Sequence, residues 1–153
     1  MKRIFLASII LLIVFLGGCN FICVDSSKNW KEEAQKLVNA FDSRDIESAE
    51  NLFAKDIKEK VNLTKQLEEA FEFYNSESID TEYNNVSGSY QRDDIDCNEE
   101  DVEVIIKTRE TTFVFMISMY TLHSDTNLMG IRELTVSKDD SKKYVSVGTD
   151  NME

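Results

Sequence analysis

The chain has 153 residues and a formal net charge of −12 at pH 7, from 29 acidic and 17 basic side chains. Nucleic-acid phosphates and anionic lipid headgroups attract basic surfaces, so this charge argues against a nucleic-acid-binding protein and against a domain held on a membrane by its own surface. The length suits one domain with a single hydrophobic core.

The N-terminus has the three parts of a secretory signal peptide. Lys2 and Arg3 precede an apolar run over residues 4–16, and two glycines and Cys19 follow it. A membrane-spanning helix needs about 20 apolar residues, so the alternative of an uncleaved span is disfavoured. We therefore expect residues 1–18 to be a signal peptide, whose removal brings the net charge to about −14.

The end of this segment is more specific. The residues Leu16-Gly17-Gly18-Cys19 resemble a bacterial lipobox. The resemblance implies cleavage between Gly18 and Cys19 and two acyl chains on Cys19, which give stable attachment where one chain binds only marginally. The partner is then the membrane, reached through these chains, and the location is the extracytoplasmic face of the bacterial cell membrane. Residues 19–28 are expected to form the lipidated N-terminus and tether, and residues 29–153 one domain.

Two further cysteines, Cys23 and Cys97, form an even pair in an oxidising compartment. This permits a disulfide between tether and domain. The alternative is that both remain thiols, because Cys23 falls in the tether and Cys97 in an acidic segment expected to be a loop. No spacing of cysteine and histidine matches a zinc site, and no cofactor is predicted.

Apolar residues at helical spacing predict three amphipathic helices in the first half of the domain. The first covers residues 29–41, with Asn29 and Glu32 placed like a capping box. The second follows a polar turn and covers residues 46–60. The third ends at about residue 74, with Asn62 as its cap.

After residue 74 the apolar period becomes two, which predicts strands. They are expected at residues 79–84, 102–107, 111–122, 128–136 and 144–147. The run over 111–122 is apolar on both faces and is therefore expected at the centre of the sheet. Gly130 interrupts the next run and is expected to mark a bulge. Helices first and a mainly antiparallel sheet afterwards predict an α+β fold with three N-terminal helices on one face.

Two segments resemble a known family. Ser-Arg-Asp-Ile-Glu-Ser-Ala-Glu-Asn-Leu-Phe at 43–53 and Asn-Leu-Met-Gly-Ile-Arg at 127–132 are similar to small lipoproteins of low-GC Gram-positive bacteria grouped as domain of unknown function 5104. The resemblance spans nearly the whole mature chain and carries no catalytic assignment. That family is similar to nuclear transport factor 2-like, or cystatin-like, folds. This implies a curved, cone-like sheet around the first helix, a pocket between them, and a homodimer through the exposed sheet face as one assembly.

An acidic segment over residues 93–101 reproduces part of a calcium loop. Asp94, Asp96 and Asn98 match its first three ligand positions. Glu99 replaces the turn glycine and Ile105 the bidentate glutamate, so a solvated strand connection is the preferred interpretation, calcium the alternative, and no metal site is predicted.

No catalytic residues are predicted. His123 is the single histidine, and as a base it would need an orienting carboxylate, for which Asp125 and Glu133 are the candidates. The alternative is a surface or turn residue. Without a second base, no Ser-His or Cys-His arrangement can be argued.

Aromatic residues supply the candidate pocket, made of Tyr83, Tyr120 and Arg132, with Trp30 and Tyr90 as further candidates at its mouth. The alternative is that the aromatic residues pack the core. Arg132 must extend outward or find a carboxylate, and Glu133 is expected on the opposite face by strand alternation.

Two function classes remain. The first is a non-enzymatic module that binds a small ligand or another envelope protein. The second is a small enzyme of the ketosteroid isomerase or dehydratase type, which needs a base deep in an apolar pocket. No acid is evident in the apolar stripes, so a binding module is expected.

Overall fold

The computed structural model describes residues 29–88, 97–139 and 141–149. Four α-helices precede the strands in this part of the chain: α2 (Trp30–Ser43), α3 (Ile46–Leu52), α4 (Lys55–Lys60) and α5 (Leu63–Tyr74). They are followed by β1 (Asp80–Ser87), β2 (Cys97–Lys107), β3 (Thr112–His123), the short 3-10 turn η1 (Thr126–Leu128), β4 (Gly130–Lys138) and β5 (Tyr144–Val147).

A polar side chain caps the N-terminus of three of the helices. The Asn29 side chain accepts from the Lys31 amide at 3.1 Å at the start of α2, and Asp45 caps α3. Asn62 accepts from the Lys65 amide at 3.3 Å, which confirms its predicted role as the cap of α5. These bonds satisfy amides that the first helical turn leaves without partners.

The predicted second helix is wrong in one respect, because it is two helices. Its apolar stripe continues across Phe53 and Ala54, but both residues are extended there. The Ala54 amide donates to the Ile131 carbonyl at 2.9 Å, and Phe53 forms a parallel bridge with Ile131. A bond to β4 therefore replaces the helical bond at this point, so the described residues hold four helices instead of three.

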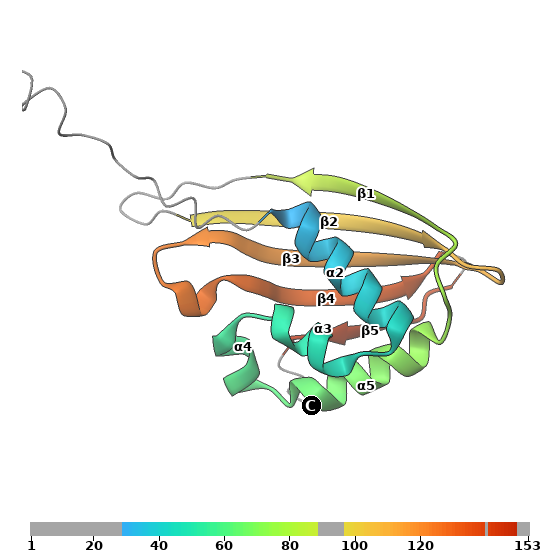
Figure 1. Cartoon of the computed structure of the whole chain (residues 1–153), viewed down its shortest axis with the longest axis horizontal. Coiled ribbons are helices and arrows are strands. Elements are labelled where there is room, and N and C mark those ends of the chain that lie inside the picture. The colour runs from blue at the N-terminus through green and yellow to red at the C-terminus, as the bar shows by residue number, and fades with distance from the viewer. Residues whose placement is uncertain (1–28, 89–96, 140, 150–153) are drawn as a thin grey trace, which may run out of the picture.

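The five strands form one antiparallel sheet in the order β1-β2-β3-β4-β5, which leaves β1 and β5 at its edges and the sheet open. β3 lies at the centre, as predicted. Figure 1 shows α2 crossing one face of the sheet obliquely, with α3, α4 and α5 grouped toward β4 and β5. The predicted α+β class, with N-terminal helices packed on one face of the sheet, is confirmed.

The core lies between these helices and the sheet. Phe41 of α2 stacks on Phe71 of α5 with ring centroids 4.2 Å apart, and it meets the edge of Phe115 on β3 at 4.9 Å. At the other edge, the Gln66 side chain accepts from the Gly148 amide and donates to the Thr149 carbonyl, both at 2.9 Å. The helical half of the chain is thereby joined to the last strand.

The bulge in β4 occurs at Arg132, two residues beyond the predicted position. Met119 pairs with Ile131 and Ser118 with Glu133, so Arg132 is the extra residue. Gly130 has a different role. Its φ is +124°, and a Cβ there would lie 2.7 Å from the Leu52 carbonyl oxygen, so glycine permits the α3–α4 junction to approach β4.

The beginning of β2 also differs from expectation. Cys97 and the acidic residues after it were predicted to form a loop, but they are the first residues of the strand. Residues 93–96 lie outside the described part.

Candidate functional site

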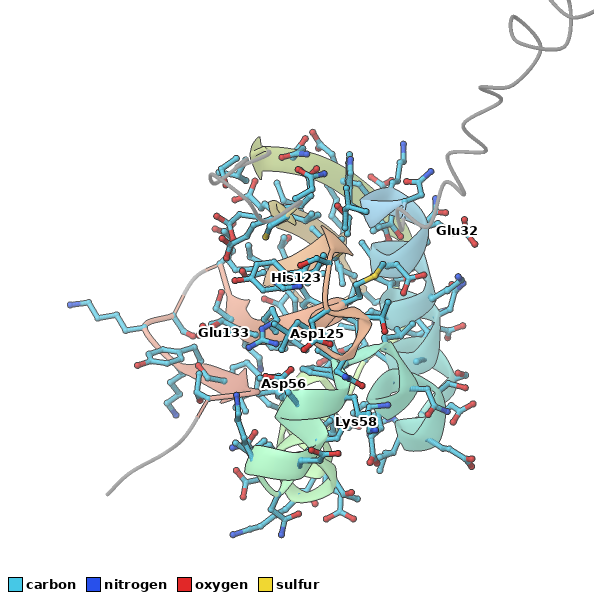
Figure 2. All side chains as sticks on the ribbon, turned by 90° about the vertical axis from the view of Figure 1, so that its left-hand side faces the viewer. Glu32, Asp56, Lys58, His123, Asp125 and Glu133 are labelled. Carbon is cyan, nitrogen blue, oxygen red and sulfur yellow. The ribbon has the colours of Figure 1, made fainter. Side chains whose placement is uncertain are left out.

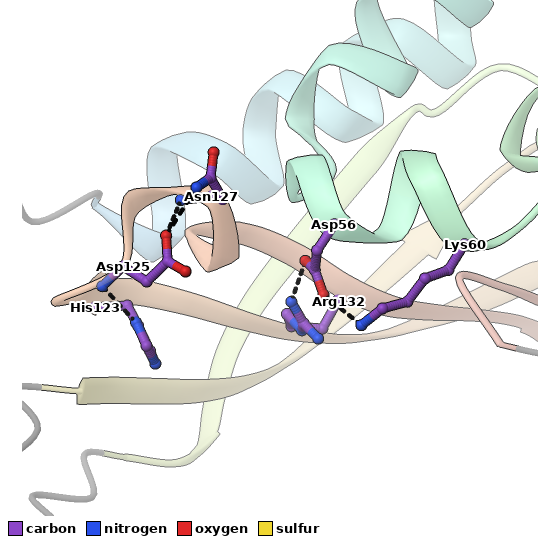
Figure 3. A network of polar contacts seen from close by, with 6 residues as sticks. All are labelled: Asp56, Lys60, His123, Asp125, Asn127 and Arg132. Carbon is purple, nitrogen blue, oxygen red and sulfur yellow. Dashed lines mark hydrogen bonds and ion pairs between the residues drawn. The ribbon is translucent and has the colours of Figure 1, made fainter.

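Arg132 is the centre of a group of charged side chains at the edge of the sheet. It forms an ion pair with Asp56 of α4 at 2.5 Å, and Lys60 binds the other Asp56 oxygen at 2.8 Å (Figure 3). Its guanidinium also lies over the Tyr120 ring, 5.2 Å from the centroid. The sequence-based expectation that Arg132 must find a carboxylate or extend outward is met by Asp56, which the sequence did not identify.

The charges in this cluster shift two pKa values. Burial raises the pKa of Asp56, but the hydrogen bonds and charges of Lys60 and Arg132 outweigh it, so the net shift is downward. Burial raises the pKa of the Tyr120 phenol, and the nearby Glu99 carboxylate raises it further. The cluster at neutral pH is therefore an ionised Asp56 held by two cations beside a protonated phenol.

His123 belongs to the turn after β3. Its Nδ1 accepts from the Asp125 amide at 2.9 Å, so the neutral ring carries its proton on Nε2. The Asp125 carboxylate accepts from the amide and the side chain of Asn127 instead of binding the imidazole (Figure 3). The ring stacks on Tyr120 at 5.3 Å. These contacts match the turn role and give His123 no orienting carboxylate from Asp125.

The structure does not bring the three candidate pocket residues together. Tyr83 pairs with Val104, whose side chain is in the core, and Lys31 of α2 lies 6.0 Å from its ring. Tyr120 pairs with Glu99 on the other face of the sheet. Tyr120 and Arg132 therefore form one contact, and Tyr83 belongs to the helix-covered face.

The prediction that Glu133 points away from the Arg132 face is also wrong. Ile131 and Leu134 are both buried, so the two residues between them both leave the core side of the strand. The bulge removes the alternation on which the prediction depended. Figure 2, in which the helices lie on the right, shows Glu133 on the side of the sheet that faces away from the helices.

The face of the sheet away from the helices, here called the open face, carries a short apolar patch with carboxylates around it. Ile105, Val114 and Met116 form the patch, and Met116 is 37% exposed. A hollow beside Met116 has Asp101 and Glu133 in its lining. The open-face carboxylates without a salt bridge in the described structure are Glu82, Glu99, Asp101, Glu103 and Glu133.

A second group of polar side chains lies on the core side of β1, β2 and β3. The Glu100 carboxylate accepts from Asn85 Nδ2 at 2.6 Å and from Asn98 Nδ2 at 2.9 Å, and Asn98 Nδ2 also donates to Thr121 Oγ1 at 2.9 Å. We call Asn85, Asn98, Glu100 and Thr121 the polar cluster. Glu100 is only 8% exposed, so this side of the sheet holds a buried acid that the predicted apolar stripes did not include.

The sequence contains a signal for this cluster. Counting back by twos from Val102, a core residue of β2, reaches Glu100 and then Asn98. Polar residues at positions that continue an apolar stripe indicate a buried polar group or the end of the strand. The acidic run around them favoured the second interpretation.

Several predicted features lie outside the part of the chain that the structure describes. These are Gly18 and Cys19 of the lipobox, Cys23, Tyr90, and the calcium-loop aspartates Asp94 and Asp96. Cys97 forms no disulfide with another described residue; its side chain is half-buried, and burial raises the pKa of the thiol. Within the described ranges, no three acidic, histidine or cysteine side chains converge on a point that would hold a metal ion.

The fold and these surfaces define a small α+β domain with helices on one face of an open antiparallel sheet and an acidic, partly apolar surface on the other. Its family follows from the sequence: the chain belongs to the family described as a domain of unknown function, DUF5104, whose model matches residues 36–139. No curated protein matches the chain. None of the described helices has the length and apolar character required to cross a membrane.

Proposed function

We propose that this chain is a lipid-anchored bacterial lipoprotein that binds a basic protein segment on its open face. The N-terminal sequence supports the anchor, because a cationic start, an apolar run and the residues Gly18-Cys19 form a lipobox-like signal. Acyl chains on Cys19 would hold the domain at the extracytoplasmic face of the membrane. The role of the domain there is binding and not catalysis.

The observation that carries the binding proposal is the composition of the open face. Met116 and its apolar neighbours offer an area that gains from losing water, and Glu103 pairs with Met116 directly across the strands. The surrounding carboxylates have no cationic partners among the described residues. A segment with lysine or arginine between apolar residues is complementary to both features.

The same charges disfavour a second copy of this chain as the occupant. Two open faces in contact would place Asp101, Glu103 and Glu133 of one copy against the same acidic set of the other. Like charges brought together at an interface cost several kcal/mol. A homodimer therefore stands as the competing outcome of the binding experiment.

The anchor is tested by Cys19→Ser in a Gram-positive host. The variant is expected to accumulate as a longer, unacylated precursor, while the native chain is processed and incorporates labelled fatty acid. Cys23→Ser is the matched control, because it removes a thiol only four residues further along the chain. Normal processing of Cys19→Ser would refute the anchor.

The open face is tested by a photo-crosslinking residue placed at Met116 in the anchored full chain. We expect an adduct whose attached peptide, mapped by mass spectrometry, is basic and partly apolar. Glu103→Gln with Glu133→Gln should abolish it. Glu47→Gln with Glu68→Gln makes the same change in charge at exposed helix positions and should leave it intact. An adduct to a second copy of the chain, or one indifferent to both pairs, would refute the proposal.

A further inference from the structure

Two carboxylates on the core side of this domain are equally buried, but only one of them is bound to a cationic side chain of the described structure. Glu33 of α2 is 8% exposed and binds the Lys36 ammonium at 3.0 Å. Glu100 is also 8% exposed, but its hydrogen-bond donors in the described structure are the neutral amides of Asn85 and Asn98. A buried carboxylate is costly unless it is paired, and the described residues supply no cation to Glu100.

The Asn98 amide adds an acceptor at the same place. Its nitrogen donates both to the Glu100 carboxylate and to Thr121 Oγ1, which fixes the orientation of the group, since a flipped amide would set its oxygen against the carboxylate. The oxygen, Oδ1, is fully buried and has no hydrogen-bond donor among the described residues. An unsatisfied buried acceptor costs about 1–3 kcal/mol, and it indicates a missing donor.

Apolar side chains lie next to this pair of acceptors. Met119 is directly opposite Glu100 across the strands, and Val102 is the next residue on the same face of β2; both are buried. Gly88 lies at the exposed side of the cluster. A Cβ at Gly88 would be 3.6 Å from Glu100 Oε2, which is an ordinary van der Waals contact.

We infer that the polar cluster binds a primary ammonium group carried on a short aliphatic stem. An ammonium has three N–H donors and a positive charge, so it can donate to Asn98 Oδ1 and to Glu100 together while neutralising the carboxylate. A metal ion fits less well, because the cluster contributes one carboxylate and calcium requires six to eight oxygen ligands. This inference is independent of the proposed role of the open face.

The inference is tested with n-butylammonium chloride as the probe and the full chain in detergent micelles. The side-chain amide signals of Asn85 and Asn98 are followed by NMR, so binding is read at the cluster itself. We expect saturable shifts with n-butylammonium and none with n-butanol, which lacks the charge. Tetramethylammonium, which has the charge but no N–H donor, should not saturate them either.

Two variants separate the site from general electrostatic attraction. Glu100→Gln keeps the size of the side chain and removes its charge, and it should weaken n-butylammonium binding about tenfold or more. Glu33→Gln is the matched control, because that carboxylate already has Lys36, and it should leave the affinity unchanged. If Glu100→Gln fails to fold, Gly88→Leu places a side chain beside Glu100 Oε2 and keeps the charge of the carboxylate, and it should also weaken binding.

A lysine side chain of another protein presents the same ammonium on a similar stem. Lysine with both its α-amino and carboxyl groups blocked distinguishes the sources: binding as tight as that of n-butylammonium assigns the site to a protein segment, and weaker binding assigns it to a free amine. Equal shifts with tetramethylammonium, saturation that persists in Glu100→Gln, displacement of the probe by calcium, or no saturation at millimolar probe would each overturn the inference.

Discussion

Replacement of Gly130 by alanine tests the contact that divides the second predicted helix. Gly130 has a φ of +124°, which L side chains rarely adopt. A Cβ there would lie 2.7 Å from the Leu52 carbonyl oxygen and 3.1 Å from the Ala54 nitrogen. Both neighbours are backbone atoms, so the clash is relieved only by moving the α3–α4 junction away from β4.

The cost has two parts. Holding a non-glycine residue in a sparsely populated backbone region costs about 1–3 kcal/mol. Moving the junction also weakens the bond from the Ala54 amide to the Ile131 carbonyl, now 2.9 Å long, which is worth about 1 kcal/mol. The expected loss of unfolding free energy is therefore about 2–4 kcal/mol, a large part of the roughly 5–15 kcal/mol that stabilises a typical domain.

Urea unfolding, followed by circular dichroism on a form that begins at residue 24, measures this loss. Gly130→Ala should lower the midpoint by about 1–2 M, with little change in slope. Gly88→Ala is the control, because its Cβ would make an ordinary 3.6 Å contact and its φ is not in the positive region. It should shift stability by less than about 1 kcal/mol. Equal midpoints for the two variants would refute the account of the junction.

Two more predictions concern ionisable side chains. Because Lys60 and Arg132 hold the pKa of Asp56 below its ordinary value of 3.8, the stability it contributes is complete above that value and is lost as the pH falls through the lower, folded-state pKa. Asp56→Asn should accordingly flatten the dependence of the urea midpoint on pH in this acidic range; an unchanged slope would contradict the assignment. Tyr74→Phe removes the 2.8 Å hydrogen bond from the buried phenol to Asp42 and should lower the unfolding free energy by about 1–2 kcal/mol, while a loss near zero by the same urea assay would show that Asp42 is satisfied by its other donors.

The sequence predicts the order of the elements because their periodicity is local. All five apolar positions of the third predicted stripe, from Leu63 to Tyr74, are buried in α5, and the doubly apolar run is the central strand. The break at Phe53 was not predictable in this way. It depends on a hydrogen bond to Ile131, 77 residues away along the chain from Ala54, while the local pattern remains helical.

The candidate site was predicted less well, for a related reason. The alternation of side chains along a strand predicted Arg132 and Glu133 on opposite faces of the sheet. The bulge in β4 turns both side chains away from the core, and it can be recognised only when the pairing of β4 with β3 is known. Glu100 was assigned to a solvated loop because acidic residues are seldom buried. Its burial depends on amides from Asn85 and Asn98, and such partners are found only after the register of β1 and β2 is known.

The link between Gln66 and the last strand affects the order in which the protein can fold during synthesis. The helices leave the ribosome before the strands, but the core that they share is completed by the sheet, and α5 rests on β5. Val147, a fully buried residue near the end of the chain, completes the core. The helical half thus emerges early, but its core cannot close until β5 is available, a delay that would suit the export we propose for this chain.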